Sequence, residues 1–192
     1  MRYSKITRTT RETDISAELE LDGSGKCEIS TGIGFFDHML TALTVHAGFD
    51  LKLTARGDLE VDGHHTVEDT GIVLGQALKE ALGGNGGIAR FGFFLLPMDE
   101  ALAECALDIC SRPYLVFEGM GAPVMIGGYD SSLTGEFMRA FAMNAGITLH
   151  LRVLYGDNAH HMAEAAYKAL GHALRMACTK TGGPALSTKG TL

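Results

Sequence analysis

Residues 64–68 read His-His-Thr-Val-Glu, and residues 160–164 read His-His-Met-Ala-Glu, 96 positions later. The similarity continues past the two motifs, since several of the residues that follow also match, among them Gly75 and Gly171. Similarity at a fixed interval indicates that a structural unit is repeated along the chain. We therefore expect two related halves, each with one copy of the motif.

The order of predicted elements is the same in the two halves, which we place at residues 1–86 and 87–192. Alternating apolar residues predict half-buried strands, and apolar residues three and four apart predict helices. In the first half we expect strands at 2–11, 15–21, 27–30 and 49–53 and helices at 35–47 and 64–82. In the second half we expect strands at 91–96, 101–109, 114–118 and 147–153 and helices at 133–145 and from 160 to about 180.

This order of elements predicts the fold class. Each half has four strands and two helices, and helices gathered on one face of a sheet form an α+β layered fold. We expect two four-stranded sheets with the helices of both halves sandwiched between them, the whole forming one compact domain. Residues 22–25, Asp-Gly-Ser-Gly, predict a hairpin turn between the second and third strands.

The repeated motif has the geometry of a metal-binding helix. His64 and Glu68 are four residues apart, so a helix places them on one face, where they can share one ion. His65 is turned away by roughly a quarter turn and is expected to face a second ion. The second motif repeats this pattern with His160, His161 and Glu164. Mixed imidazole and carboxylate ligands suit manganese, iron or zinc.

Two further histidines lie near the motifs but are not repeated. His38 opens the first predicted helix and aligns with Glu136, whereas His150 lies in a predicted strand and aligns with Lys52. Both can be read as ordinary polar residues. However, a site with one histidine and one glutamate is short of ligands, which keeps His38 and His150 open as additional donors.

Composition and charge exclude several classes of function. The net charge of −7 and the lack of a basic stripe argue against nucleic-acid binding. No apolar run is long enough to span a membrane, and residues 1–10 lack the apolar region of a signal peptide. The four cysteines show no C-x-x-C spacing and are expected to be reduced thiols. We therefore expect a cytoplasmic protein with neither membrane nor nucleic-acid partners.

Five motifs together resemble the imidazoleglycerol-phosphate dehydratase family of histidine biosynthesis. They are Phe-Phe-Asp-His-Met-Leu at 35–40, Asp-Gly-His-His-Thr-Val-Glu-Asp at 62–69, Arg-Pro-Tyr-Leu at 112–115, Asn-Ala-His-His-Met-Ala-Glu-Ala at 158–165 and Ser-Thr-Lys-Gly at 187–190. The resemblance implies a duplicated fold similar to domain 2 of ribosomal protein S5. It also implies a homo-oligomer of 24 subunits, with active sites between chains and two Mn2+ ions in each.

The resemblance also implies roles for individual residues. One ion would be held by His38, His65, His160 and Glu164, and the other by His64, Glu68, His150 and His161. The phosphate of the substrate would be bound by Arg90, Arg112, Lys168, Ser187 and Lys189. Arginine suits two-point contact with phosphate and lysine acts as a point charge. Ala42 departs from the family, which usually has Gln at this position.

The implied reaction converts D-erythro-imidazole-glycerol phosphate to imidazole-acetol phosphate. The C–H bond that breaks has no neighbouring carbonyl to acidify it, so we expect the imidazole ring to be held between two metal ions acting as Lewis acids. A carboxylate must also transfer protons. Glu68 and Glu164 take part in catalysis as metal ligands, which leaves Glu12 as the expected proton-transfer group and substrate contact.

Two other functions fit the ligand pattern alone. A binuclear metallohydrolase acting on a small phosphorylated substrate would use a metal-bound hydroxide as its nucleophile. A metal-storage or structural assembly would carry the same histidines but would have no turnover, and it would leave Arg90, Arg112 and Lys189 unexplained.

Overall fold

The computed structural model describes residues 2–84, 86–184 and 187. The elements of the first half are β1 (Tyr3–Thr9), β2 (Thr13–Glu20), β3 (Cys27–Ser30), α1 (Gly34–Ala47), β4 (Asp50–Gly57) and α2 (His64–Leu82). Those of the second half are β5 (Phe91–Met98), β6 (Ala101–Ile109), β7 (Tyr114–Glu118), β8 (Met125–Ile126), β9 (Tyr129–Asp130), α3 (Leu133–Ala145), β10 (Ile147–Tyr155) and α4 (Ala159–Ala177).

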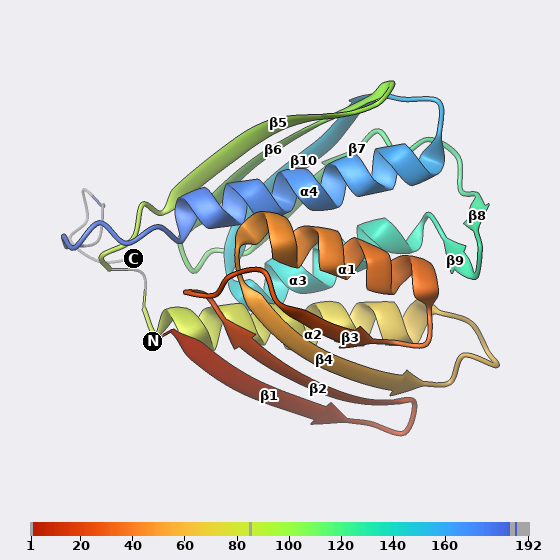
Figure 1. Cartoon of the computed structure of the whole chain (residues 1–192), viewed down its shortest axis with the longest axis horizontal. Coiled ribbons are helices and arrows are strands. Elements are labelled where there is room, and N and C mark those ends of the chain that lie inside the picture. The colour runs from red at the N-terminus through yellow and green to blue at the C-terminus, as the bar shows by residue number, and fades with distance from the viewer. Residues whose placement is uncertain (1, 85, 185–186, 188–192) are drawn as a thin grey trace.

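The two sheets have the same topology. Their strand orders are β1-β2-β4-β3 and β5-β6-β10-β7, so in each half the strand before the last helix lies inside the sheet. The two sheets form the outer layers, and the four helices lie between them (Figure 1). This arrangement confirms the predicted α+β class. The proposed division between residues 86 and 87 falls in the connection from α2 to β5.

The predicted pairing of the third strand was wrong. β3 does not return against β2; it runs parallel to β4 at the far edge of the sheet, with Ile29 opposite Leu53. The hairpin is formed instead by β1 and β2.

Residues 21–26 cross the end of β4 because the Asp50 side chain holds them there. Its Oδ1 accepts hydrogen bonds from the backbone N–H groups of Ser24 and Lys26 at 2.6 and 2.9 Å. A Cβ atom on Gly23 would lie 2.4 Å from the Asp50 nitrogen. Gly23 is therefore needed because the chain passes close to the backbone of Asp50, and not because it forms a hairpin turn. The short β8–β9 hairpin was also not predicted, because two-residue strands carry too little pattern.

The core fills the space between the sheets and the helices. Ile15, Ala17 and Leu19 of β2 are buried, whereas the residues between them are at least partly exposed, which confirms the alternating pattern. None of the described helices is long and apolar enough to cross a membrane.

The repeated glycines explain how closely the two helix layers approach. α2 packs against α3 and α1 packs against α4. A Cβ atom on Gly75 would lie 2.6 Å from the carbonyl oxygen of Phe141, and one on Gly171 would lie 2.6 Å from that of Leu43. Each half thus uses the same repeated position to bring two helix backbones together.

We expect Gly75→Ala and Gly171→Ala each to reduce the free energy of unfolding by about 1–3 kcal/mol, because the added methyl group must push the helices apart. Urea denaturation of each variant measures this. Gly34→Ala is the matched control, since a Cβ at this helical position meets no atom within 4 Å. Equal stability of all three variants would contradict the role of the glycines.

Asp22 ties the two halves together at the end where the chain starts. Its carboxylate accepts hydrogen bonds from Arg2 at 2.6 Å and from Lys180 at 2.8 Å. These two cations hold the pKa of Asp22 well below its usual value. The stabilisation is therefore complete above the unfolded pKa of about 3.9 and is lost as the pH falls below it.

The expected result is that Asp22→Asn loses less stability than the original chain on acidification from about pH 5 to about pH 3. Chemical denaturation at the two pH values measures the difference. Parallel losses in both proteins would show that this carboxylate does not contribute.

Candidate active site

All four helices begin at the same end of the molecule (Figure 1). α1, α2, α3 and α4 each follow a strand that ends there, namely β3, β4, β9 and β10. The motif histidines lie in the first turns of α2 and α4, and His38 lies in the second turn of α1. The parallel direction of the helices therefore gathers the candidate ligands at one end.

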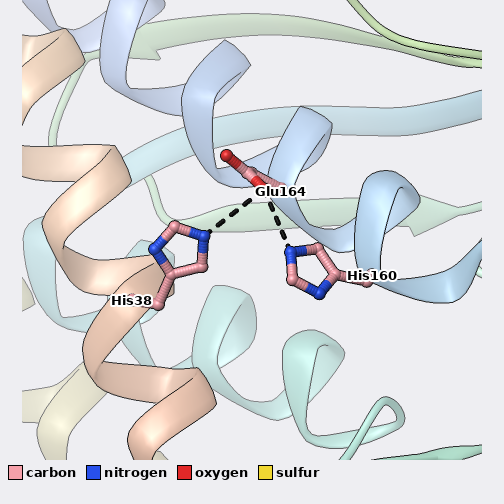
Figure 2. A group of neighbouring side chains, drawn as sticks. All are labelled: His38, His160 and Glu164. Atoms are coloured by element: carbon pink, nitrogen blue, oxygen red, sulfur yellow. Dashed lines mark hydrogen bonds and ion pairs between the residues drawn. The ribbon is translucent and has the colours of Figure 1, made fainter.

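One cluster joins α1 and α4. The Nε2 atoms of His38 and His160 lie 3.4 and 3.2 Å from Oε2 of Glu164, as Figure 2 shows. One ligand atom from each of the three residues lies within 4.8 Å of the others. Two imidazoles and a carboxylate converging in this way fit a divalent transition-metal ion.

Glu164 is charged although it is buried. Burial alone would raise its pKa, but the Lys168 ammonium, 2.7 Å from Oε1, outweighs this and the pKa lies below its usual value. His38 acts in the same direction. Glu164 is therefore held as the carboxylate that a cation requires.

Aromatic rings form one wall of this cluster. The Phe35 ring lies 4.9 Å from the His160 ring and 6.5 Å from the His38 ring, centroid to centroid. Its other neighbour is Tyr129, at 5.2 Å. The ring limits the orientations open to both imidazoles.

His64 and Glu68 form the equivalent pair on α2. His64 Nε2 lies 3.5 Å from Glu68 Oε2, at the predicted spacing of one helical turn. Both side chains are nearly half exposed. Within the described part of the chain, no third ligand residue completes a group with this pair.

The second histidine of each motif points elsewhere and contacts a carboxylate. Nδ1 of His65 lies 3.0 Å from Asp58 Oδ2, and Nδ1 of His161 lies 2.7 Å from Glu100 Oε2. These carboxylates raise the pKa of both histidines. Conversely, the hydrogen bond from His161, together with backbone N–H groups, lowers the pKa of Glu100 to about 2.

Within one chain the structure brings together only some of the predicted ligand sets. His65 lies outside the cluster of His38, His160 and Glu164. His150 is on the outer face of the second sheet, away from the helices. His161 lies near Asp99 and Glu100 rather than near His64 and Glu68.

Asp58 and Glu100 were missed by the sequence analysis. Glu100 has the place that Glu12 has in the equivalent hairpin loop of the first half, whereas the residue after β10 that matches Asp58 is Gly156. Glu100 lies in the β5–β6 hairpin loop and Asp58 follows β4, which means that different elements supply the two carboxylates. Only the folded chain shows that both carboxylates contact the second histidine of a motif.

Glu12 lies beside the first motif, in the β1–β2 hairpin loop. Its carboxylate is 3.8 Å from Nε2 of His65 and is more than half exposed. Its carbonyl oxygen accepts a hydrogen bond from the backbone N–H of Asp58 at 3.1 Å. The predicted proton-transfer residue is therefore fixed next to a predicted ligand.

Arg90, unlike Lys168, lies at the opposite end of the second half from the histidine cluster. Two hydrogen bonds, at 2.6 and 2.9 Å, orient the Arg90 guanidinium against Asp108. Its backbone N–H donates to Ala177 at the end of α4, about 20 Å along the helix from Glu164. Lys189 lies outside the described residues, and Ser187 follows α4 in the C-terminal segment.

Arg112 lies in the loop between β6 and β7, at the same end as Arg90. Its guanidinium is exposed and lies 4.0 Å from Asp108, and its carbonyl accepts from Thr148 at 2.9 Å. The two arginines and the histidine cluster therefore occupy opposite ends of one chain.

Comparisons with known proteins identify the family. The family model described as imidazoleglycerol-phosphate dehydratase matches residues 31–174. Curated proteins of that name from Phenylobacterium zucineum and Gluconobacter oxydans are 54% and 53% identical, and the alignments cover 100% of this chain and 99% and 98% of theirs.

Solved structures of imidazoleglycerol-phosphate dehydratase agree. The enzyme from Staphylococcus aureus superposes with a TM-score of 0.84 at 38% identity, covering 93% of this chain and 99% of that one. The enzyme from Pyrococcus furiosus, in complex with (S)-C348, gives 0.84 at 41% identity, covering 97% and 100%. With two sheets, a repeated His-His-x-x-Glu motif and these matches along its whole length, the chain belongs to the imidazoleglycerol-phosphate dehydratase family of hydro-lyases.

Proposed function

We propose that this chain dehydrates D-erythro-imidazole-glycerol phosphate to imidazole-acetol phosphate in L-histidine biosynthesis, using two Mn2+ ions in each active site. The observation that carries the proposal, beyond family membership, is the convergence of His38, His160 and Glu164 at the N-terminal end of the helices. Such a donor set suits manganese.

The eight predicted ligands remain our assignment for the two ions. His38, His160 and Glu164 with His65 would hold one, and His64, Glu68, His150 and His161 the other. When bound, the ions supply Lewis acidity to the imidazole ring. The chain itself contributes the arrangement, because α1 and α4 already place three donors of the first set together.

The positions of the remaining ligands support sites between chains. His65 and His150 lie apart from their predicted partners in one chain, and so do Arg90 and Arg112. A second and a third chain would bring these residues to the cluster without any change of fold. We therefore propose a homo-oligomer, with 24 subunits as the family resemblance implies.

The outer face of the second sheet supports assembly. Phe93 is 67% exposed, and Phe91, Leu95 and Tyr114 on the same face are also exposed. The backbone registers place Phe93, Ala106, His150 and Val116 in one row across the four strands. Large exposed apolar faces mark interaction surfaces, and the predicted ligand His150 lies inside this one. We propose that another copy of the chain covers it.

Several side chains have proposed roles around the substrate. Arg90, held by Asp108, and the exposed Arg112 would bind the phosphate. Lys168 keeps Glu164 ionised and lies next to the metal cluster, from which it would also reach the phosphate.

Glu12 is the proposed proton-transfer group. Its carboxylate is exposed and next to a predicted metal ligand, His65, so a bound substrate can reach it. Glu100, in the equivalent hairpin loop of the second half, is unsuited, because both its oxygens accept hydrogen bonds and its pKa of about 2 leaves it without a proton to donate.

We place the reaction in the cytoplasm. All four cysteines are free thiols in the structure, as expected of a protein from a reducing compartment.

The direct test is turnover of the proposed substrate. Manganese-loaded protein is incubated with imidazole-glycerol phosphate, and proton NMR follows the product while a colorimetric assay follows inorganic phosphate. The proposal predicts imidazole-acetol phosphate with no phosphate release. Release of inorganic phosphate without the ketone would instead support the metallohydrolase alternative.

A further inference from the structure

The second histidine of each motif is held in the same way in both halves. Both oxygens of Asp58 lie within hydrogen-bond distance of Nδ1 of His65, at 3.1 and 3.0 Å. Glu100 Oε2 lies 2.7 Å from Nδ1 of His161. In contrast, the first histidine of each motif turns its Nε2 toward the glutamate one helical turn on, at 3.5 Å in His64 and 3.2 Å in His160.

The duplication accounts for this similarity only in part. Asp58 comes from the connection that precedes α2, whereas Glu100 comes from the hairpin between β5 and β6. Glu100 matches Glu12 in the β1–β2 hairpin loop of the first half, whose carboxylate lies 3.8 Å from Nε2 of His65, whereas the residue after β10 that matches Asp58 is Gly156. In both halves a carboxylate therefore lies against Nδ1 of the second histidine, although the segment that supplies it differs.

We propose that Asp58 and Glu100 are positioning residues that orient His65 and His161 and fix their tautomers for metal binding. The inference rests on the proposed function. A carboxylate accepts a hydrogen bond from Nδ1–H, which leaves the lone pair on Nε2 as the ligand. Nε2 of each imidazole lies on the other side of the ring, 3.8 Å from Glu12 in His65 and 3.5 Å from Asp99 in His161.

The surroundings of the two carboxylates fit this role. Among the described residues, the Asp58 side chain makes its hydrogen bonds to His65 alone. Glu100 is anchored as well, because its Oε1 accepts from the backbone N–H groups of Asn158 at 2.8 Å and Asp157 at 3.3 Å. One oxygen thereby fixes the loop that leads into α4 while the other fixes the histidine that α4 carries.

Asp58 gives the cleaner test because the hydrogen bonds of its side chain in the described part of the chain go to His65 alone. Electron paramagnetic resonance of free Mn2+ gives the affinity at constant pH. We expect Asp58→Ala to bind Mn2+ about 10- to 100-fold more weakly, as is usual for outer-shell carboxylates. Asp58→Asn keeps an oxygen that accepts from Nδ1–H, so its Mn2+ affinity is expected to lie between those of Asp58→Ala and the original chain. Glu60→Gln, two residues further along the same loop, is the matched control and is expected to bind normally. Glu100→Ala and Glu100→Gln repeat the test for His161.

A double-mutant cycle separates positioning from a general effect on the fold. In a His65→Ala background, Asp58→Ala is expected to change the affinity less than twofold, because the residue it acts through is gone. If Asp58→Ala weakens Mn2+ binding just as much in the His65→Ala background, or does not weaken it at all in the original chain, the positioning role is overturned. Either result would leave the proposed function standing. Failure of the original chain to bind Mn2+ would overturn the metal-dependent function together with the positioning role.

Discussion

Replacing Glu12 by Gln is expected to lower kcat by about 10²- to 10⁴-fold, the usual contribution of a positioned acid–base group. The amide keeps the size of the side chain, and the backbone hydrogen bonds of Glu12 in the loop are unchanged, but the amide can neither accept nor donate the proton. The Glu12 carboxylate makes no structural ion pair other than its 3.8 Å approach to His65 in the described part of the chain, so the fold should be unaffected. Steady-state kinetics with the natural substrate measure kcat and KM separately.

The matched control for this variant is Glu80→Gln, which removes the same charge from an exposed position near the end of α2. Its kcat should equal that of the original chain. The Glu12→Gln protein should still bind Mn2+ and substrate. Retained turnover in Glu12→Gln would exclude this residue from proton transfer.

Removal of the metal is expected to abolish turnover and to loosen the assembly. If ligands arrive from different chains, each ion links subunits, and its binding free energy contributes to the stability of the oligomer. The metal-free oligomer should therefore dissociate into smaller species. Light scattering after size-exclusion chromatography measures the mass before and after treatment with a chelator, and readdition of Mn2+ should restore both mass and activity.

Glu164→Gln provides the control for metal removal. It removes the one carboxylate of the His38–His160–Glu164 cluster, so readdition of Mn2+ should not restore its activity. An apo protein that keeps both its mass and its turnover would show that the ions neither link chains nor take part in the reaction.

Much of the fold could be predicted because its signals are local. The alternation in β2 and the four-residue spacing within each motif depend only on the geometry of a strand or a helix. The repeat then doubled every local signal, so the order of elements in one half supported that in the other. The match between Gly75 and Gly171 was visible in the sequence, but its reason, the approach of another helix backbone, was not.

What could not be predicted depends on contacts between distant segments. β3 was assigned to the wrong neighbour because a Gly-rich turn looks the same in a hairpin and in a crossing, and the side chain that decides, Asp50, lies 24 residues beyond Lys26. Asp58 had no sequence signal, since carboxylates in surface loops are common and its match after β10 is Gly156. Glu100 matches Glu12, but only the folded chain shows that both lie beside a motif histidine.

The metal-ligand sets could be predicted only in part, for a different reason. Helix geometry correctly paired His64 with Glu68 and His160 with Glu164, and the family resemblance added His38, which the structure places beside Glu164. The assignment of all eight residues to metal remains a prediction, and within one chain His65, His150 and His161 lie apart from their predicted partners.

Anomalous diffraction at the manganese edge, from crystals of the Mn2+-loaded protein, tests the central claim most directly. The account predicts two manganese peaks for each chain, one on the cluster of His38, His160 and Glu164 and one on His64 and Glu68, with each coordination sphere completed by residues from a neighbouring chain. Peaks coordinated by residues of a single chain, or no manganese at these side chains, would contradict it.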